Sequence, residues 1–250
     1  MIISNQIIIG NSNVGFNPLS FNPHNYWDAD NLTIVTTTTT ANDLASVHDV
    51  ANPAAGNQPT FDASDADFNN LGSLAFDGST DYLYKSFANY GSTFNDGCIY
   101  IVFRTGADFA ANYPIISFSA EASNIEKVQL YTLINGKLRF LINYGGTNNI
   151  IENDLLLTIN TTYVARFCAT GTLYTTSINN ANTAQTTISG ANDGKYFNDL
   201  TTLTNIVLGA RINTSSLFSN HKIAAWGSFP SLTVPEDASL MSGLMTKYGV

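Results

Sequence analysis

Short runs in which hydrophobic and polar residues alternate dominate the chain beyond residue 70. A period of two places successive side chains on opposite faces of a strand. Gly, Asn, Asp or Ser bound each run, as is typical of turns. The pattern predicts strands at 73–76, 82–87, 98–104, 115–119, 128–133, 137–143, 163–169, 173–178, 206–210 and 223–229.

Two hairpins are predicted from the turn residues between these strands. Asn135-Gly136 separates two apolar runs, and a type I′ turn needs positive φ at both central residues, which Asn and Gly tolerate best. Gly171 marks a second reversal, between VARFC and LYTTSI. The run CIYIVF at 98–103 is apolar throughout, so we expect a central strand covered on both faces.

Only the end of the chain has the signature of a helix. Thr233 and Glu236 have the spacing of a capping box, with Pro235 in the first turn, and apolar residues recur every four positions from Leu240 to Tyr248. Many short strands followed by one helix indicate an all-β fold. We predict a two-sheet antiparallel jelly-roll β-sandwich with one short C-terminal helix.

Composition narrows the possible partners. Hydrophobic residues make up 44% of the 250 residues, enough for a sizeable core, while 30 Asn and 28 Thr supply much of the polar surface. The net charge is −9 and the ten Lys and Arg form no basic run, so we expect no nucleic-acid partner. No stretch reaches the ~18 uninterrupted apolar residues of a membrane helix, so we expect no membrane insertion.

The first 22 residues differ from the rest of the chain. They are punctuated by Asn and Pro, and they lack the basic start and long apolar run of a secretory signal. We predict an N-terminal arm or assembly segment at 1–22 and one domain at 23–250.

The two cysteines, Cys98 and Cys168, both lie within apolar, strand-like runs. Because free cysteine is among the most buried residue types, we interpret them as two buried thiols, with a disulfide as the alternative.

A series of motifs along 22–250 has a recognisable order. NYWDADNL at 25–32 is similar to W-x-D-A-x-x-L, and LAFDGSTDYL at 74–83 is similar to V-x-F-D-G-x-D-D-Y-L. The apolar strand at 98–104, the N-G-K-L hairpin and IVLGAR at 206–211 follow. In this order the motifs resemble concanavalin A-like (laminin-G-like) jelly-roll domains of phage virion and bacterial surface proteins. Val47 and Ala225 stand where those domains carry Trp and Glu.

The resemblance implies a non-catalytic structural module of a phage virion, such as a head or tail decoration, fibre or receptor-binding component, with glycan-binding capacity. The implied location is the virion surface, with an extracellular or cell-surface location as the alternative. Expected partners are other virion proteins, contacted through the arm, and cell-surface glycans, within a homo-oligomer or larger assembly. Two alternatives stay open: a glycoside hydrolase or lyase on this fold, and a purely structural virion protein without a ligand.

Candidate catalytic groups are few. Glucanases of this fold need carboxylates at E-x-D-x-x-E spacing, and the nearest match has Glu152 and Asp154 but Leu157 in place of the second Glu. We therefore predict no catalytic residues. The three histidines are isolated along the sequence and are interpreted as structural or surface residues: His24, His48 and His221.

Two acidic clusters are candidates for a calcium site, which related jelly rolls hold at a sheet rim through carboxylates and carbonyls. Asp62, Asp65 and Asp67 form the first, with a solvated loop as the alternative. Asp77 and Asp81 form the second, where we favour a turn because Asp accepts backbone N–H bonds and the following glycine allows positive φ. No cofactor is required, and calcium is the only one the pattern suggests.

Sugar binding needs an exposed aromatic ring beside planar amides or carboxylates. Four tyrosines next to Gly, Asn or Lys are the candidates, with ordinary loop packing as the alternative: Tyr90, Tyr113, Tyr144 and Tyr196.

Overall fold

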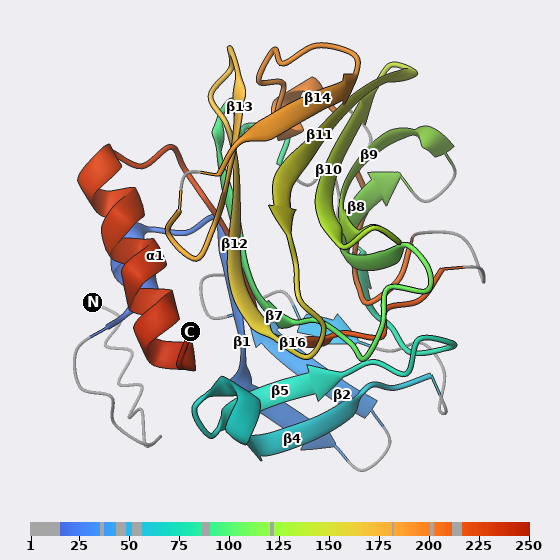
Figure 1. The fold of residues 1–250 in the computed structure, drawn as a ribbon, viewed down its shortest axis with the longest axis vertical. Coiled ribbons are helices and arrows are strands. Elements are labelled where there is room, and N and C mark those ends of the chain that lie inside the picture. The colour runs from blue at the N-terminus through green and yellow to red at the C-terminus, as the bar shows by residue number, and fades with distance from the viewer. Residues whose placement is uncertain are drawn as a thin grey trace, which may run out of the picture.

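The part of the chain that the structure describes folds into two antiparallel sheets of seven strands each, with one helix near the C-terminus (Figure 1). The computed structural model describes residues 16–35, 38–43, 49–51, 57–86, 91–120, 123–181, 183–200, 203–211 and 217–250. The predicted β-sandwich is thus confirmed. Within the described residues, no helix is long and apolar enough to cross a membrane.

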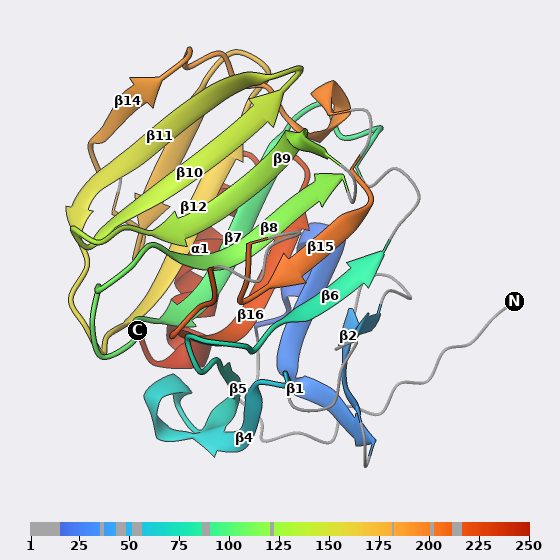
Figure 2. The same ribbon diagram turned by 90° about the vertical axis from the view of Figure 1, so that its right-hand side faces the viewer.

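In both sheets the order of the strands in space differs from their order along the chain. From one edge to the other, the first sheet consists of β13 (Tyr174–Ile178), β12 (Thr162–Ala169), β7 (Gly97–Arg104), β16 (Lys222–Phe229), β1 (Asn25–Val35), β2 (Thr38–Asp43) and β3 (Asp49–Ala51). The second consists of β6 (Leu83–Ser86), β15 (Asn205–Leu208), β8 (Tyr113–Ala120), β9 (Ser123–Thr132), β10 (Lys137–Tyr144), β11 (Thr147–Leu156) and β14 (Gln185–Ser189). Figure 2 shows the second sheet in front of the first.

Strands β4 (Thr60–Asp65) and β5 (Leu71–Ala75) form a hairpin, and β5 pairs with β16. The two sheets are joined at the residue pair Ala51 of β3 and Tyr84 of β6. The described residues also form three short 3₁₀ helices: η1 (Pro18–Phe21), η2 (Ala66–Phe68) and η3 (Phe197–Asp199).

The main core lies between the sheets. It consists of inward-facing residues at alternate positions along the strands of both sheets, such as Val128 and Leu130 of β9 and Ile99 and Ile101 of β7. The predicted central strand is confirmed, because β7 pairs with both β12 and β16. Its opposite face, with Tyr100, belongs to a second apolar cluster.

Helix α1 (Val234–Tyr248) covers the outer face of the first sheet (Figure 1). The predicted capping box is present, since the Glu236 carboxylate accepts from the Thr233 N–H at 2.9 Å. Two ion pairs fasten the helix to the sheet, Arg166 with Asp237 and Lys247 with the buried Asp28. Phe16 also packs on this helix, so the described part of the predicted arm contacts the domain.

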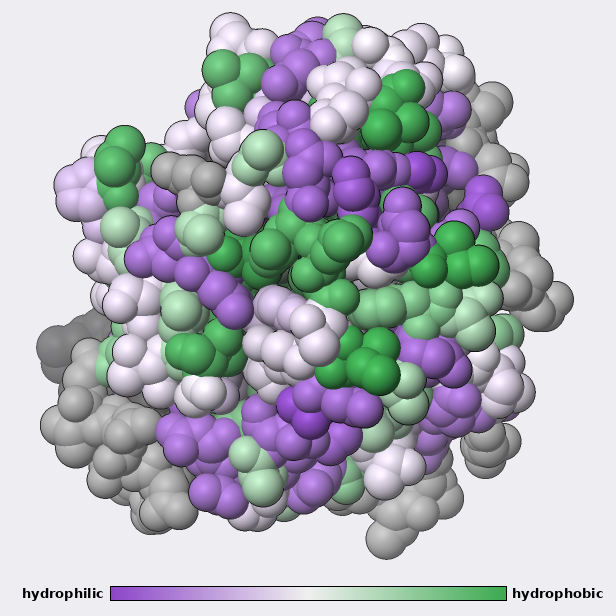
Figure 3. Space-filling model, in the orientation of Figure 1, coloured by the Kyte–Doolittle hydropathy of each residue, from purple (hydrophilic) through white to green (hydrophobic). Residues whose placement is uncertain are grey.

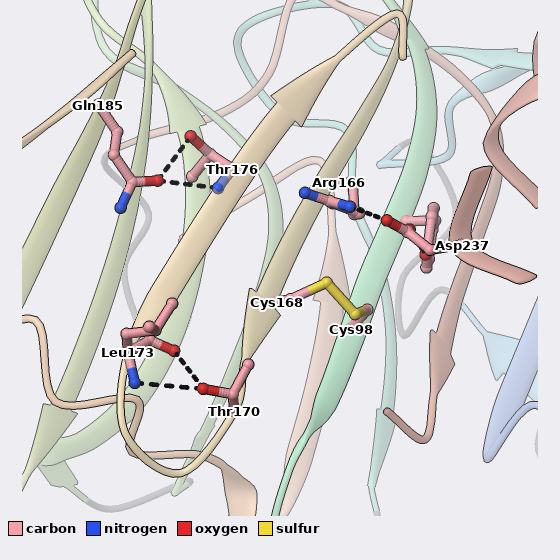
Figure 4. Close-up of a disulfide and its surroundings, with 9 residues drawn as sticks. Cys98, Arg166, Cys168, Thr170, Leu173, Thr176, Gln185 and Asp237 are labelled. Carbon is pink, nitrogen blue, oxygen red and sulfur yellow. Dashed lines mark hydrogen bonds and ion pairs between the residues drawn. A yellow bond between two sulfur atoms is a disulfide. The ribbon is translucent and has the colours of Figure 1, made fainter. Parts of the chain in front are cut away.

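The interpretation of the cysteines as free thiols is wrong. Cys98 on β7 lies directly opposite Cys168 on β12, with 4.0 Å between the Cα atoms, and the two form a disulfide (Figure 4). They are separated by 70 residues in sequence, so strand register alone brings them together.

The hairpin at Asn135-Gly136 is confirmed, but its turn type is not. Gly136 has φ of 75°, whereas Asn135 has negative φ, and the Gly136 N–H donates to the Leu133 carbonyl at 2.8 Å. This geometry is a three-residue loop with a bulged glycine rather than a type I′ turn. Positive φ at both central residues occurs instead at Gly145-Gly146, which joins β10 to β11, and at Asn179-Asn180.

Strands β1 to β4, β11 and β14 lie outside the ten predicted runs. Strand β11 has the largely polar sequence TNNIIENDLL, so it lacks the apolar run that marks the predicted strands. Its polar side chains take part in an amide network near its start and in ion pairs near its end. Two exposed apolar side chains lie at and just beyond its end, with Leu156 63% and Ile159 43% exposed. Figure 3 shows hydrophobic areas scattered among hydrophilic ones on the face of the molecule seen in Figure 1.

Candidate functional site

The Asp77–Asp81 segment is a turn closed by its own side chains. The Asp77 Oδ1 atom accepts from the backbone N–H groups of Ser79 at 2.8 Å, Thr80 at 2.8 Å and Asp81 at 3.0 Å. Gly78 has φ of 75°, and its N–H donates to the Ser219 carbonyl at 2.8 Å. The Asp77 carboxylate therefore stabilises the turn by accepting hydrogen bonds from its backbone N–H groups, in the place of a backbone carbonyl.

The two carboxylates of this turn differ in acidity. Burial raises the pKa of Asp77, but hydrogen bonds from Ser79, Thr80 and Asp81 outweigh it and hold that pKa well below its ordinary value. Burial and then the charge of Asp77 raise the pKa of Asp81 to about 6.

Most of the other acidic cluster is neutralised by cations. The Lys222 Nζ atom lies 2.9 Å from carboxylate oxygens of both Asp65 and Asp67, and Arg104 Nε lies 3.1 Å from Asp67. Asp62 is exposed, and its carboxylate accepts from the Ser64 N–H at 3.0 Å. The structure thus brings Asp65 and Asp67 together around a lysine.

The calcium prediction therefore stays a prediction. Within the residues that the structure describes, no group of three or more His, Cys, Asp or Glu side chains is arranged to hold a metal ion. Calcium at the first cluster would compete with Lys222 and Arg104 for the carboxylates.

The three candidate tyrosines that the structure describes do not form one exposed platform. Tyr196 is fully buried, and Tyr113 is 9% exposed with its hydroxyl 2.8 Å from Asp108, so neither offers an exposed ring. Tyr144 is half-buried and donates to Asp193 at 2.9 Å. Tyr90 lies outside the described residues.

The acidic residues of β11 are tied to basic side chains. Glu152 pairs with Arg139 of β10, with Nε to Oε1 at 2.8 Å, and Asp154 pairs with Lys137 at 2.9 Å. Glycoside hydrolysis needs one carboxyl group that can act as an acid. Hydrogen bonding to Lys137, the largest influence, lowers the pKa of Asp154, so this carboxylate is poorly suited to act as the acid.

A pocket of about 140 Å³ lies on the outer face of the second sheet. Lys127, Gln129 and Tyr131 line it from alternate positions of β9, whose intervening residues Val128 and Leu130 point into the core. Pro114 of β8 and Leu141 of β10 supply apolar walls. On the neighbouring strand β9, Pro114 pairs with Tyr131 and Leu141 pairs with Gln129.

Two further polar residues reach the pocket from outside the strands. Asn112 precedes β8, and Arg211 follows β15. Tyr131 is itself positioned by Arg139, whose guanidinium lies 5.8 Å from the ring centre. The pocket therefore combines an aromatic ring, two amides and two cations.

Sequence reasoning missed this pocket. The alternation in KVQLYT was visible and places Lys127, Gln129 and Tyr131 on one face, but Arg211 is distant in sequence and reaches them only through sheet order.

Comparisons with known proteins support the fold. No protein-family model matches the sequence, and a comparison with curated proteins found no match. Among solved structures, a Trypanosoma rangeli sialidase in complex with 2,3-difluoro-KDN has a TM-score of 0.60 and 10% identity, covering 89% of this chain and 32% of the sialidase. The CBM40 module of Ruminococcus gnavus IT-sialidase, bound to α2,3-sialyllactose, has a TM-score of 0.53 and 13% identity, covering 67% of this chain and 94% of the module.

A leech intramolecular trans-sialidase complexed with 2,7-anhydro-Neu5Ac also matches, with a TM-score of 0.52, 12% identity and 27% of its own length covered. This chain thus spans about a quarter to a third of the length of these two sialidases. At 10–13% identity, these matches show that the chain shares the jelly-roll, concanavalin-like β-sandwich fold of sialidase domains and CBM40 modules.

Proposed function

We propose that this chain is a non-catalytic carbohydrate-binding module and that its ligand site is the pocket on the outer face of β8, β9 and β10. The observation that carries the proposal is the composition of that pocket, where the Tyr131 ring stands beside the amides of Gln129 and Asn112. The likeness in fold to a CBM40 module bound to sialyllactose adds support, since that module is a binding domain.

The chemistry of the pocket suits a sugar. Ligand sites combine apolar walls with a few convergent polar groups, and here Pro114 and Leu141 provide the walls. Amide side chains donate and accept at once, which matches sugar hydroxyls.

Binding without hydrolysis is supported by the state of the acidic residues near this face. Glu152 and Asp154 are each paired with a cation, and in a retaining glycosidase one carboxyl group must be protonated to act as the acid.

We further propose a location outside the cytoplasm, on a virion or cell surface. The Cys98–Cys168 disulfide supports it, because disulfides persist in oxidising surroundings and are rare in reducing ones. Mass spectrometry of purified particles or surface fractions, with the disulfide mapped, tests this location, and recovery of the chain only in reduced cytosolic form would contradict it.

A glycan array followed by calorimetry tests the binding function. Tyr131→Ala is expected to weaken binding at least tenfold, whereas Tyr144→Ala, on the same sheet but outside the pocket, should leave it unchanged. Retained affinity in Tyr131→Ala would move the site elsewhere, and a blank array would reject the function. Calcium and chelator arms of the same array test the calcium prediction.

A further inference from the structure

The basic residues of this acidic chain are unevenly partnered. Seven of the ten form ion pairs with carboxylates: Arg104, Lys137, Arg139, Arg166, Lys195, Lys222 and Lys247. Three have no carboxylate partner within the described part of the chain: Lys85, Lys127 and Arg211. Of these three, Lys127 and Arg211 line the same pocket.

The arrangement of these two cations is costly without a ligand. Lys127 is only 8% exposed, and burial followed by the charge of Arg211 lowers the pKa of its amine. The Nε atom of Arg211 is buried and has no hydrogen-bond acceptor in the described structure. Like charges that share a buried site repel each other, and a buried donor without an acceptor loses its hydration.

An anion in the pocket would relieve both costs. It would supply the acceptor that the Arg211 guanidinium lacks and would screen the repulsion between the two side chains. The guanidinium presents paired N–H donors that match the two oxygens of an oxyanion, while the ammonium of Lys127 adds a compact charge. Acidic residues outnumber basic ones in this chain, whose net charge is −9, so two neighbouring cations without a carboxylate partner in the described structure are unusual for it.

We propose that the pocket selects acidic sugars and that Lys127 and Arg211 together hold the oxyanion, a carboxylate or a sulfate. This inference rests on the proposed function and names the ligand class of the same site. Tyr131 and Gln129 then face the sugar ring and its hydroxyls.

The test compares neutral sugars with acidic counterparts that carry a carboxylate or a sulfate. Calorimetry at low and high salt measures lactose against 3′-sialyllactose, glucose against glucuronic acid, and N-acetylglucosamine against its 6-sulfate. The wild-type protein should bind the acidic member of at least one pair tenfold or more tightly, and high salt should weaken that preference. The pair that responds distinguishes carboxylate from sulfate.

Matched variants locate the effect. Arg211→Gln and Lys127→Gln should each reduce the preference at least fivefold, whereas Lys85→Gln removes the same charge outside the pocket and should keep it. The salt dependence of the wild-type protein needs no variant and covers the case in which a substitution prevents folding.

The outcomes separate the two proposals. Equal affinity for neutral and acidic sugars, with binding still lost in Tyr131→Ala, would overturn the acidic-sugar proposal and leave carbohydrate binding intact. An acidic preference that survives in Arg211→Gln and Lys127→Gln would also overturn it. Absence of binding to every sugar would overturn both.

Discussion

The buried His221 side chain predicts a loss of stability in acid. Both of its ring nitrogens are engaged, with the Gly106 N–H donating to Nδ1 at 3.0 Å and Nε2 lying 2.7 Å from the Thr132 hydroxyl. Because Nδ1 accepts a hydrogen bond, the neutral ring carries its proton on Nε2 and donates it to Thr132. Burial lowers the pKa of His221 to about 3, against a small opposing effect of the Asp108 charge.

The magnitude follows from the difference between the folded and unfolded states. In the unfolded chain the imidazole takes up a proton below its ordinary pKa of 6.5, whereas in the folded chain it stays neutral down to about pH 3. The unfolded state thus binds more protons in this window, and the free energy of unfolding falls as the pH drops. At about 1.4 kcal/mol per pH unit, acidification from pH 7 to pH 4.5 should remove roughly 2–3 kcal/mol through this residue.

Urea unfolding at several pH values measures this effect. The wild-type protein should lose more stability between pH 7 and 4.5 than His221→Gln, which is less stable at pH 7 but lacks the titrating group. The difference between the two slopes isolates His221 from the carboxylates that titrate in the same range. Equal slopes, or a ring-nitrogen NMR titration of His221 in the folded protein near pH 6.5, would refute the reasoning.

The disulfide and the Asp77 turn are each expected to contribute measurable stability. Replacing Cys98 and Cys168 by Ala opens a loop with a sequence separation of 70 and should lower the unfolding free energy by about 4 kcal/mol. Chemical reduction of the wild-type disulfide should lower the stability measured by urea unfolding to a similar extent. Unchanged urea midpoints would contradict this prediction. Asp77→Ala leaves three backbone N–H groups without their acceptor and should cost about 1 kcal/mol. Asp77→Asn should lower the pKa of Asp81 from about 6, because the neighbouring charge is gone, and an NMR titration unaltered by the substitution would speak against that cause.

The local features of this fold were encoded in short stretches of sequence. Alternation predicted β9 and β10 because strand geometry has a period of two. Thr233 and Glu236 predicted the helix start because capping depends on residues three positions apart. Gly136 predicted a reversal, although the turn type depended on the strand twist and loop length of the finished hairpin.

Features that join distant segments could not be predicted in this way. Cys98 and Cys168 pair because β7 and β12 are neighbours in one register, and a shift by one residue would place the two sulfurs on opposite faces. Asp65 and Asp67 suggested a metal site in sequence, yet the sheet brings Lys222 against them.

Part of the candidate site could likewise be predicted from the sequence, and part depended on the fold. The alternation along one strand was enough to place Lys127, Gln129 and Tyr131 on a common face, since side chains alternate along an extended backbone. The folded sheet was needed to bring Arg211 beside them and to leave the pair without a neutralising carboxylate among the described residues. Backbone geometry is set by neighbours in sequence, whereas the electrostatic environment of a side chain is set by whatever the fold places beside it.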